Sequence, residues 1–328
     1  MPPLSSPLLP SLTRRRLVIV TGKGGTGKSS VAAALGLAAA REGRRVLLME
    51  TGRDEVLPRL LGSNQTAGYS GCELQPGLRA MRLDAYEALA EYLGLQLGLR
   101  RLVRGVLGNK GFRELLDAAP GWRELITLGT VWHLQQQTHS NGGPLYDLIV
   151  VDAPATGHGL TLLDVPRVVA AAVRAGPLRR NAERVEAMLR DPDATVLLPV
   201  ALPEELPARE TAELVTRVRD GIGIPVDRVV VNAMPAPPFP VGLETLDERL
   251  AAIPRTADIP GLPEPGVLAR CARHFAERHA LAAEYFERVG TWTELPTVPL
   301  PLLPGGVETR EDVERLSRAL VSAEGPAT

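Results

Sequence analysis

The chain has 328 residues, of which 45% are hydrophobic and 23% are charged, and this composition excludes a disordered or fibrous protein. Its 37 basic and 38 acidic residues give a net charge of −1. No overall positive field therefore exists to attract nucleic acid or an anionic membrane surface, and we expect no nucleic-acid partner.

The sequence carries no targeting or membrane-spanning signal. No apolar run reaches the roughly 18–20 residues that a transmembrane helix needs, and the first charges follow the apolar residues, unlike in a secretory signal. Cys72 and Cys271 form no CxxC motif and predict neither a disulfide framework nor a zinc site. We expect a cytoplasmic protein with a flexible leader at 1–13 and no integral membrane segment.

Two buried strands with a helix between them are predicted near the N-terminus. Residues 17–20 (LVIV) and 45–50 (RVLLME) are apolar runs typical of parallel strands, and the intervening small-residue helix ends at Gly43. Residues 53–140 differ, because their apolar side chains recur at helical spacing with arginines on the other faces. This pattern predicts a helical subdomain at about 55–140, and we expect part of 160–190 to belong to it.

Strand patterns return after the helical segment. Apolar runs at 146–151, 195–200 and 227–231 alternate with helical stretches, and a long amphipathic helix is expected at 263–290. A strand within 295–303 and a helix at about 308–323 follow. Strands that alternate with helices predict an α/β fold with a mostly parallel sheet covered by helices, and we expect a single domain over 14–325.

A glycine-rich motif follows the first strand directly. The string GKGGTGKS at 22–29 fits the pattern GxxxxGK[ST] of phosphate-binding loops. Its amides form an anion-binding nest at a helix start, Lys28 supplies a charge to the phosphates, and Ser29 offers a hydroxyl to Mg²⁺. The motif predicts a P-loop nucleotide-binding fold with ATP and Mg²⁺ as cofactors. The predicted nucleotide-binding residues are Gly22, Lys23, Gly24, Gly25, Thr26, Gly27, Lys28, Ser29 and Ser30.

Lys23 adds a second lysine to this loop, in a chain with three lysines and 34 arginines. The loop thereby resembles the deviant Walker A loop of a family of dimeric ATPases that includes MinD, ParA, the nitrogenase iron protein and the ArsA-type ATPases. The resemblance implies that Lys23 reaches the nucleotide of a partner subunit. There it would stabilise charge on the transferring phosphoryl group, as an arginine finger does.

The string DAPATGH at 152–158 follows another predicted strand and resembles the signature of the ArsA-type ATPases. An acid at this place normally orients Mg²⁺, which makes Asp152 a predicted metal and catalytic residue beside Ser29. Pro154, Gly157 and Gly159 predict a loop that moves with the γ-phosphate. His158 is either a contact of the site or an ordinary loop histidine.

The resemblance extends over most of 15–325, apart from the helical segment. It implies that Asn232, in VVVNAM, reads the adenine edge, and that the loop beginning at Pro301, in PLLPGG, closes over the base. The sequence departs from the family at Gly52, where an aspartate usually orients the attacking water. Glu50 and Asp54 are the nearby carboxylates that could replace it. We therefore predict a slow ATPase.

The remaining expectations concern partners. Two cysteines are too few for an arsenite site. The sequence has no CxxC motif that could bridge two subunits through a metal ion, so a dimer, either of two identical chains or with a paralogue, would be held together by the nucleotide and by packing alone. Segments 86–108 and 160–190 are apolar enough to contribute a small pocket for a hydrophobic client or membrane protein, although ordinary helix packing in the core is the better explanation of them.

Three other functions fit parts of the pattern. A MinD- or ParA-like positioning ATPase would need a basic amphipathic C-terminal helix, whereas RLSRALVSAEGPAT is short and weakly basic. A non-hydrolysing subunit of a heterodimer fits the missing aspartate. A small-molecule phosphotransferase shares the loop but explains neither Lys23 nor the string that begins at Asp152.

Overall fold

The structure of the chain is a computed structural model. It describes residues 14–52, 54–97, 109–118, 121–140, 142–238 and 265–322, together with Leu12, Leu107, Glu248 and Arg249. The statements below concern these residues.

Eight strands form one sheet in the order β3-β4-β2-β5-β1-β6-β7-β8. All neighbouring pairs are parallel except β3 and β4, which pair antiparallel at the edge. The predicted α/β fold with a mostly parallel sheet is confirmed. The strands are β1 (Leu17–Gly22), β2 (Val46–Glu50), β3 (Cys72–Gln75), β4 (Leu78–Arg82), β5 (Leu148–Asp152), β6 (Thr195–Ala201), β7 (Val229–Met234) and β8 (Thr297–Pro301).

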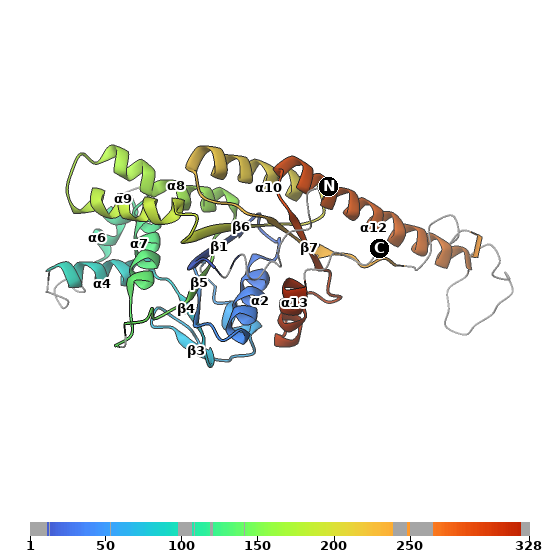
Figure 1. The fold of residues 1–328 in the computed structure, drawn as a ribbon, viewed down its shortest axis with the longest axis horizontal. Helices are drawn as coiled ribbons and strands as arrows, with labels where there is room; N and C mark the ends of the chain where they lie inside the picture. The colour runs from blue at the N-terminus through green and yellow to red at the C-terminus, as the bar shows by residue number, and fades with distance from the viewer. Residues whose placement is uncertain are drawn as a thin grey trace.

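Helices cover both faces of this sheet, and they extend beyond one end of it through α4, α6 and α9 and beyond the other through α12 (Figure 1). Those described are α2 (Lys28–Arg41), α3 (Leu57–Leu60), α4 (Ala85–Leu97), α6 (Lys110–Asp117), α7 (Trp122–Gln136), α8 (Thr156–Ala172), α9 (Pro177–Arg190), α10 (Glu205–Thr216), the π-helix η1 (Arg217–Ile222), α12 (Pro265–Thr293) and α13 (Arg310–Ser322).

The central strands divide their side chains between two cores. In β1, Val18 and Val20 pack into the core that includes α2 and α13, whereas Leu17 and Ile19 pack into the core that includes α7, α8 and α9. Successive strand residues point to opposite faces. Because both faces are buried, the strand must be apolar throughout, which is why it appears in the sequence as an unbroken run.

Helix α2 is buried on nearly every side. Its residues 31–39 are all buried, and most of them are alanines. Small side chains let the helix lie close to the sheet and to α13, with which it shares one core. The helix therefore holds its first residue, Lys28, in a fixed place at the edge of the sheet.

The sequence misplaced two features of the fold. The segment expected to be helical at 55–140 contains the edge strands β3 and β4, joined by a turn at Gly77, so its helical part begins at α4. Short strands that face solvent on one side lack the long apolar runs by which the other strands were found. The expected mobile loop after Asp152 is shorter than predicted, because α8 begins at Thr156 and the Gly159 amide already donates to the Ala155 carbonyl oxygen.

The leader predicted at 1–13 lies outside the described residues except for Leu12. This side chain is fully buried in the core beside α2 and α13. A fully buried leucine stabilises the fold by roughly 1.5–3 kcal/mol. Leu12, inside the expected leader, therefore packs with the core of the fold.

Candidate functional site

The glycine-rich loop lies at the carboxyl edge of the sheet, between β1 and α2. Strand β1 is flanked by β5 and β6. Strands β2 to β5 lie on one side of β1 and β6 to β8 on the other, so the chain crosses past β1 between β5 and β6. Open parallel sheets bind ligands at such a reversal of strand order, outside the carboxyl ends of the strands. The topology alone therefore places the predicted phosphate loop at the usual ligand crevice.

The loop is braced by its own polar groups. The Lys23 carbonyl oxygen accepts hydrogen bonds from Thr26 Oγ1 and from Lys28 Nζ, each at 3.0 Å. Asn232, 206 positions away on β7, donates from Nδ2 to the Thr26 carbonyl oxygen at 2.9 Å. Gly27 has φ 85°, and a Cβ at this position would lie 2.2 Å from Asn232 Nδ2. The left-handed backbone and the close amide both require glycine.

Lys28 and Ser29, the first residues of α2, face Asp152 at the end of β5. Ser29 Oγ donates to Asp152 Oδ2 at 2.5 Å, while Asp152 Oδ1 is buried with no hydrogen-bond partner. Burial raises the pKa of Asp152, against the Ser29 hydrogen bond and the charge of Lys28. Burial also lowers the pKa of Lys28, against the charge of Asp152. The site thus places the partly buried ammonium group of Lys28 near the buried carboxylate of Asp152, one oxygen of which has no hydrogen-bond partner.

Glu50 stands beside Asp152, because the two residues are register partners at the ends of β2 and β5. It is 2% exposed. Glu50 Oε1 accepts the backbone N–H groups of Val56 at 2.6 Å and Leu57 at 2.9 Å, at the start of α3, and Oε2 is buried without a partner. Burial raises the pKa of Glu50, against these two hydrogen bonds, and the charge of Asp152 raises it further.

The other carboxylate considered from the sequence is placed differently. Asp54 is exposed, as is Gly52, where a side chain would meet no atom within 4 Å. The structure therefore brings Glu50 to Asp152 and leaves Asp54 on the surface.

Lys23 has a partner that sequence reasoning missed. Its Nζ lies 2.6 Å from Glu210 Oε1 on α10. The two residues are 187 positions apart, and no short-range pattern connects them. The only available signal was topological, since α10 follows β6, the neighbour of the strand that carries the loop.

The remaining predicted residues lie around this core of the site. Ser30 is in the first turn of α2, Gly24 and Gly25 lie in the loop, and Gly22 ends β1. Pro301 is exposed at the end of β8, in register with Met234 on β7, two residues after Asn232. Thr156 and Gly157 open α8, directly after β5 and its short connection.

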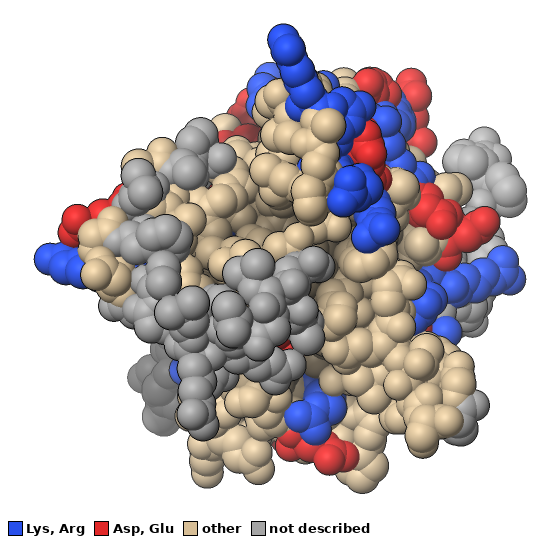
Figure 2. Space-filling view, turned by 90° about the vertical axis from the view of Figure 1, so that its left-hand side faces the viewer, with Lys and Arg blue, Asp and Glu red and all other residues tan. Residues whose placement is uncertain are grey.

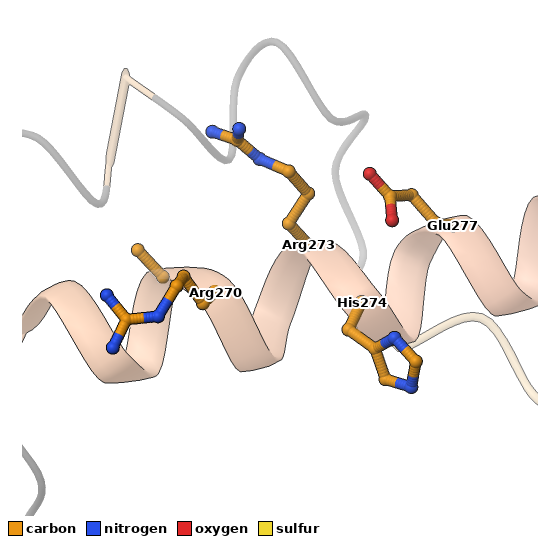
Figure 3. Close-up of a pocket in the computed structure, with 5 residues that line it drawn as sticks. Arg270, Arg273, His274 and Glu277 are labelled. Carbon is orange, nitrogen blue, oxygen red and sulfur yellow. The ribbon is translucent and has the colours of Figure 1, made fainter.

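One other hollow on the described surface differs from this site. A shallow hollow on α12 is lined by Ala269, Arg270, Arg273, His274 and Glu277. These side chains fan out along one helix instead of converging from several elements (Figure 3). Within the described residues, no group of three or more His, Cys, Asp or Glu side chains is arranged to hold a metal ion. None of the described helices has the length and apolar character needed to cross a membrane.

A phosphate loop between a central strand and a buried helix, with a lysine at the helix start and a serine–aspartate pair beside it, defines a P-loop nucleotide-binding protein. The family model described as "Anion-transporting ATPase" matches residues 15–181. The chain belongs to this family, and the predicted resemblance to ArsA-type ATPases is confirmed.

Relatives named as ATPases match along most of the chain. ATPase BagA of Mycobacterium tuberculosis is 31% identical over 308 residues, which cover 89% of each protein. ATPase GET3B of Arabidopsis thaliana is 25% identical over 69% of this chain and 66% of its own length. ATPase GET3 of Kluyveromyces lactis is 26% identical over 71% of this chain and 75% of its own length.

Proposed function

We propose that the chain binds ATP with Mg²⁺, hydrolyses it slowly, and couples nucleotide binding to the pairing of two subunits and to capture of a hydrophobic client or partner protein. The observation that carries the proposal is the Ser29–Asp152 contact next to Lys28, at the start of a helix that points its N-terminus at the loop. An anionic polyphosphate gains from the lysine charge, the loop amides and the helix dipole together.

The residues present fit Mg²⁺. This ion prefers hard oxygen ligands and is usually held by a hydroxyl or carboxylate together with substrate phosphates. Ser29 Oγ is within hydrogen-bonding distance of Asp152, and Asp152 Oδ1 is buried without a partner. Ser29 and Asp152 would hold the ion, and the ion would neutralise charge on the phosphates. Binding a cation here would also relieve the burial of an unpaired carboxylate oxygen.

Glu50 is our candidate for orienting the water that attacks the γ-phosphate. It is buried next to Asp152 and has one oxygen without a partner. Its other oxygen caps α3, so the same side chain would link the reaction to the segment that follows β2. Asp54, which is exposed, provides the matched control.

The first experiment is a phosphate-release assay on the purified chain with Mg²⁺ and ATP. We expect slow turnover, little or none of it in Lys28→Ala, a decrease of about 10²-fold or more in Glu50→Gln, and wild-type turnover in Asp54→Asn. ATP that binds tightly but is never hydrolysed would refute the ATPase and favour a non-hydrolysing subunit that works with a paralogue. Turnover in the presence of candidate paralogues would then be measured.

Pairing of two copies is supported by Lys23 and by the GET3-named relatives, which resemble this chain over about 70% of its length. A lysine at the loop entrance would place its charge at the nucleotide of the second copy. Native mass measurement with a non-hydrolysable ATP analogue tests this, and a chain that stays monomeric with saturating analogue and with candidate paralogues would refute it. Whether the second copy is identical or a paralogue would follow from the mass.

Client capture is supported by the end of the molecule that carries α4, α6, α7, α8 and α9. Over the described part of this face, uncharged side chains cover a broad area and charged side chains gather at its edges (Figure 2). A groove of about 560 Å³ lies between α8, η1 and the start of α7, and Leu160, Val165, Val168 and Ile222 are among its lining residues. A π-helix such as η1 often marks a functional site.

Binding of a labelled peptide with an apolar helix of about 20 residues tests this surface. Val168, which is 50% exposed in the groove, is changed to Asp, and Val321, which is 48% exposed on α13, is changed to Asp as the control. We expect the first change to weaken peptide binding and the second to leave it unaltered. Equal binding by both variants would refute a client site in this groove.

The membrane-positioning alternative is not favoured by α13. Its apolar residues Val313, Leu316 and Leu320 are completely buried in the core beside α2. A helix that docks its apolar face on its own domain has no such face left for a membrane. Pelleting with anionic vesicles in the presence of ATP would overturn this view if the chain sedimented with them.

A further inference from the structure

The ion pair between Lys23 and Glu210 joins the phosphate loop to α10. Nζ and Oε1 are 2.6 Å apart, and the two side chains are 32% and 33% exposed. An ion pair that is two-thirds buried restricts both side chains more than a fully solvated pair does. Lys23 is thus directed towards its own subunit.

Both ends of this ion pair are held by their surroundings. The Lys23 backbone is fixed by Thr26 and Lys28, which donate hydrogen bonds to its carbonyl oxygen. Glu210 lies on a helix whose inner face is anchored by Ala208 and Thr211, both essentially fully buried. The contact is therefore set by the packing of α10 and by the shape of the loop.

The charged residues next to Glu210 on α10 do not share its contact with Lys23. Arg209 lies 3.2 Å from Glu205 and stacks over the ring of Trp292 at 5.7 Å from its centroid. Glu213, one turn further along the same helix, is exposed. Glu210 is accordingly the carboxylate that faces Lys23, and Glu213 provides a control of the same charge on the same helix.

We propose that Glu210 is a positioning residue that retains Lys23 in its own subunit, and that pairing of two copies around ATP requires this ion pair to break. The proposal rests on the proposed function, in which Lys23 serves the nucleotide of the second copy. In the proposal, the ammonium group that contacts Glu210 at 2.6 Å has to leave this carboxylate of its own subunit to lie against a phosphate across an interface. Glu210 therefore opposes pairing until ATP supplies a stronger attraction for the lysine.

The first experiment measures the dissociation constant of the dimer formed with a non-hydrolysable ATP analogue. Two ion pairs break per dimer, so Glu210→Gln should tighten it roughly five- to thirtyfold. The control Glu213→Gln should leave it unchanged. In a Lys23→Ala background, Glu210→Gln should have no effect, because the lysine that it releases is missing.

These measurements separate the present inference from the proposed function. If the wild-type chain stays monomeric with saturating analogue, the proposed pairing fails and this inference fails with it. If the wild-type chain pairs and Glu210→Gln pairs with the same constant, only the inference fails. If Glu210→Gln tightens pairing equally with and without Lys23, Glu210 acts through another group and the inference is again wrong.

A second experiment examines the contact itself in the nucleotide-free chain. The chain has only three lysines, so limited acylation followed by mass spectrometry reports Lys23 separately. Lys110, whose side chain is 92% exposed, serves as an internal reference. Glu210→Gln should raise the acylation rate of Lys23 several-fold relative to Lys110, and Glu213→Gln should not. An unchanged Lys23 rate in a folded Glu210→Gln variant would overturn the inference.

Discussion

Three glycines of the phosphate loop should respond differently to the same small change, Gly→Ala. A Cβ at Gly24 would lie 4.0 Å from its nearest neighbour, Ala155 Cβ, and no strained φ is found there. Gly25 has φ 84° but open space around the added carbon. Gly27 combines φ 85° with Asn232 Nδ2 at 2.2 Å from the added carbon. The cost of adding one methyl group should therefore increase from Gly24 to Gly25 to Gly27.

The expected losses in the free energy of unfolding follow from these three environments. Gly24→Ala should be close to neutral, because nothing is displaced. Gly25→Ala should cost about 1–2 kcal/mol for the left-handed backbone alone. Gly27→Ala should cost about 1.5–3.5 kcal/mol, because the Asn232 hydrogen bond to Thr26, worth about 0.5–1.5 kcal/mol, is lost as well.

Urea unfolding of the nucleotide-free chain measures this series, provided that the slope of the transition is the same for all variants. Combining Gly27→Ala with Asn232→Ala removes the clash, so the double variant should be more stable than the sum of the single losses predicts. If the losses in the free energy of unfolding from the two changes were strictly additive, the added Cβ at Gly27 would not clash with Asn232. Equal losses at Gly24 and Gly27 would refute the whole argument.

Other predictions concern charge at the site. Lys28→Ala should weaken ATP binding about 10–150-fold by titration calorimetry, because a charged contact contributes about 1.5–3 kcal/mol, whereas Lys110→Ala should leave it unchanged. Asp152→Asn should abolish the difference between ATP affinities measured with Mg²⁺ and with EDTA, and a persisting difference would place the ion elsewhere. Since burial raises the folded-state pKa of Glu50 above the unfolded value of about 4.3, its contribution to stability should be lost as pH rises through that interval. Unfolding curves across pH should show this loss in the wild-type chain, and Glu50→Gln should show a smaller loss, because burial raises the pKa of Asp152 as well.

Most of the fold could be predicted because its central strands are buried on both faces. Leu17, Ile19, Val150 and their neighbours form uninterrupted apolar runs, which need no knowledge of distant residues to recognise. Strands β3 and β4 escaped prediction because they lie at one edge of the sheet and contain polar side chains such as Glu73. Their pairing depends on a turn and on the strand beside them, which local periodicity does not encode.

The residues of the site likewise fall into those that local sequence predicts and those that depend on distant parts of the chain. Lys28 and Ser29 at the start of α2 and Asp152 at the end of β5 could be predicted from motif and spacing, since the carboxyl ends of parallel strands meet at one edge of the sheet. The capping of α3 by Glu50 and the pairing of Lys23 with Glu210 depend on three-dimensional packing. Asn232 was indicated by family resemblance only, and its hydrogen bond to Thr26 could not have been foreseen from residues 206 positions apart.

The contact between Arg209 and Trp292 gives the protein a built-in optical reporter. Of the three tryptophans, Trp122 and Trp132 lie on α7 and Trp292 lies on α12. The ring of Trp292 contacts Arg209 of α10, the residue next to Glu210. Replacing both α7 tryptophans by phenylalanine would leave a single indole whose emission follows the surroundings of α10. The proposed release of Lys23 from Glu210 would then be tested by stopped-flow fluorescence without attaching a dye.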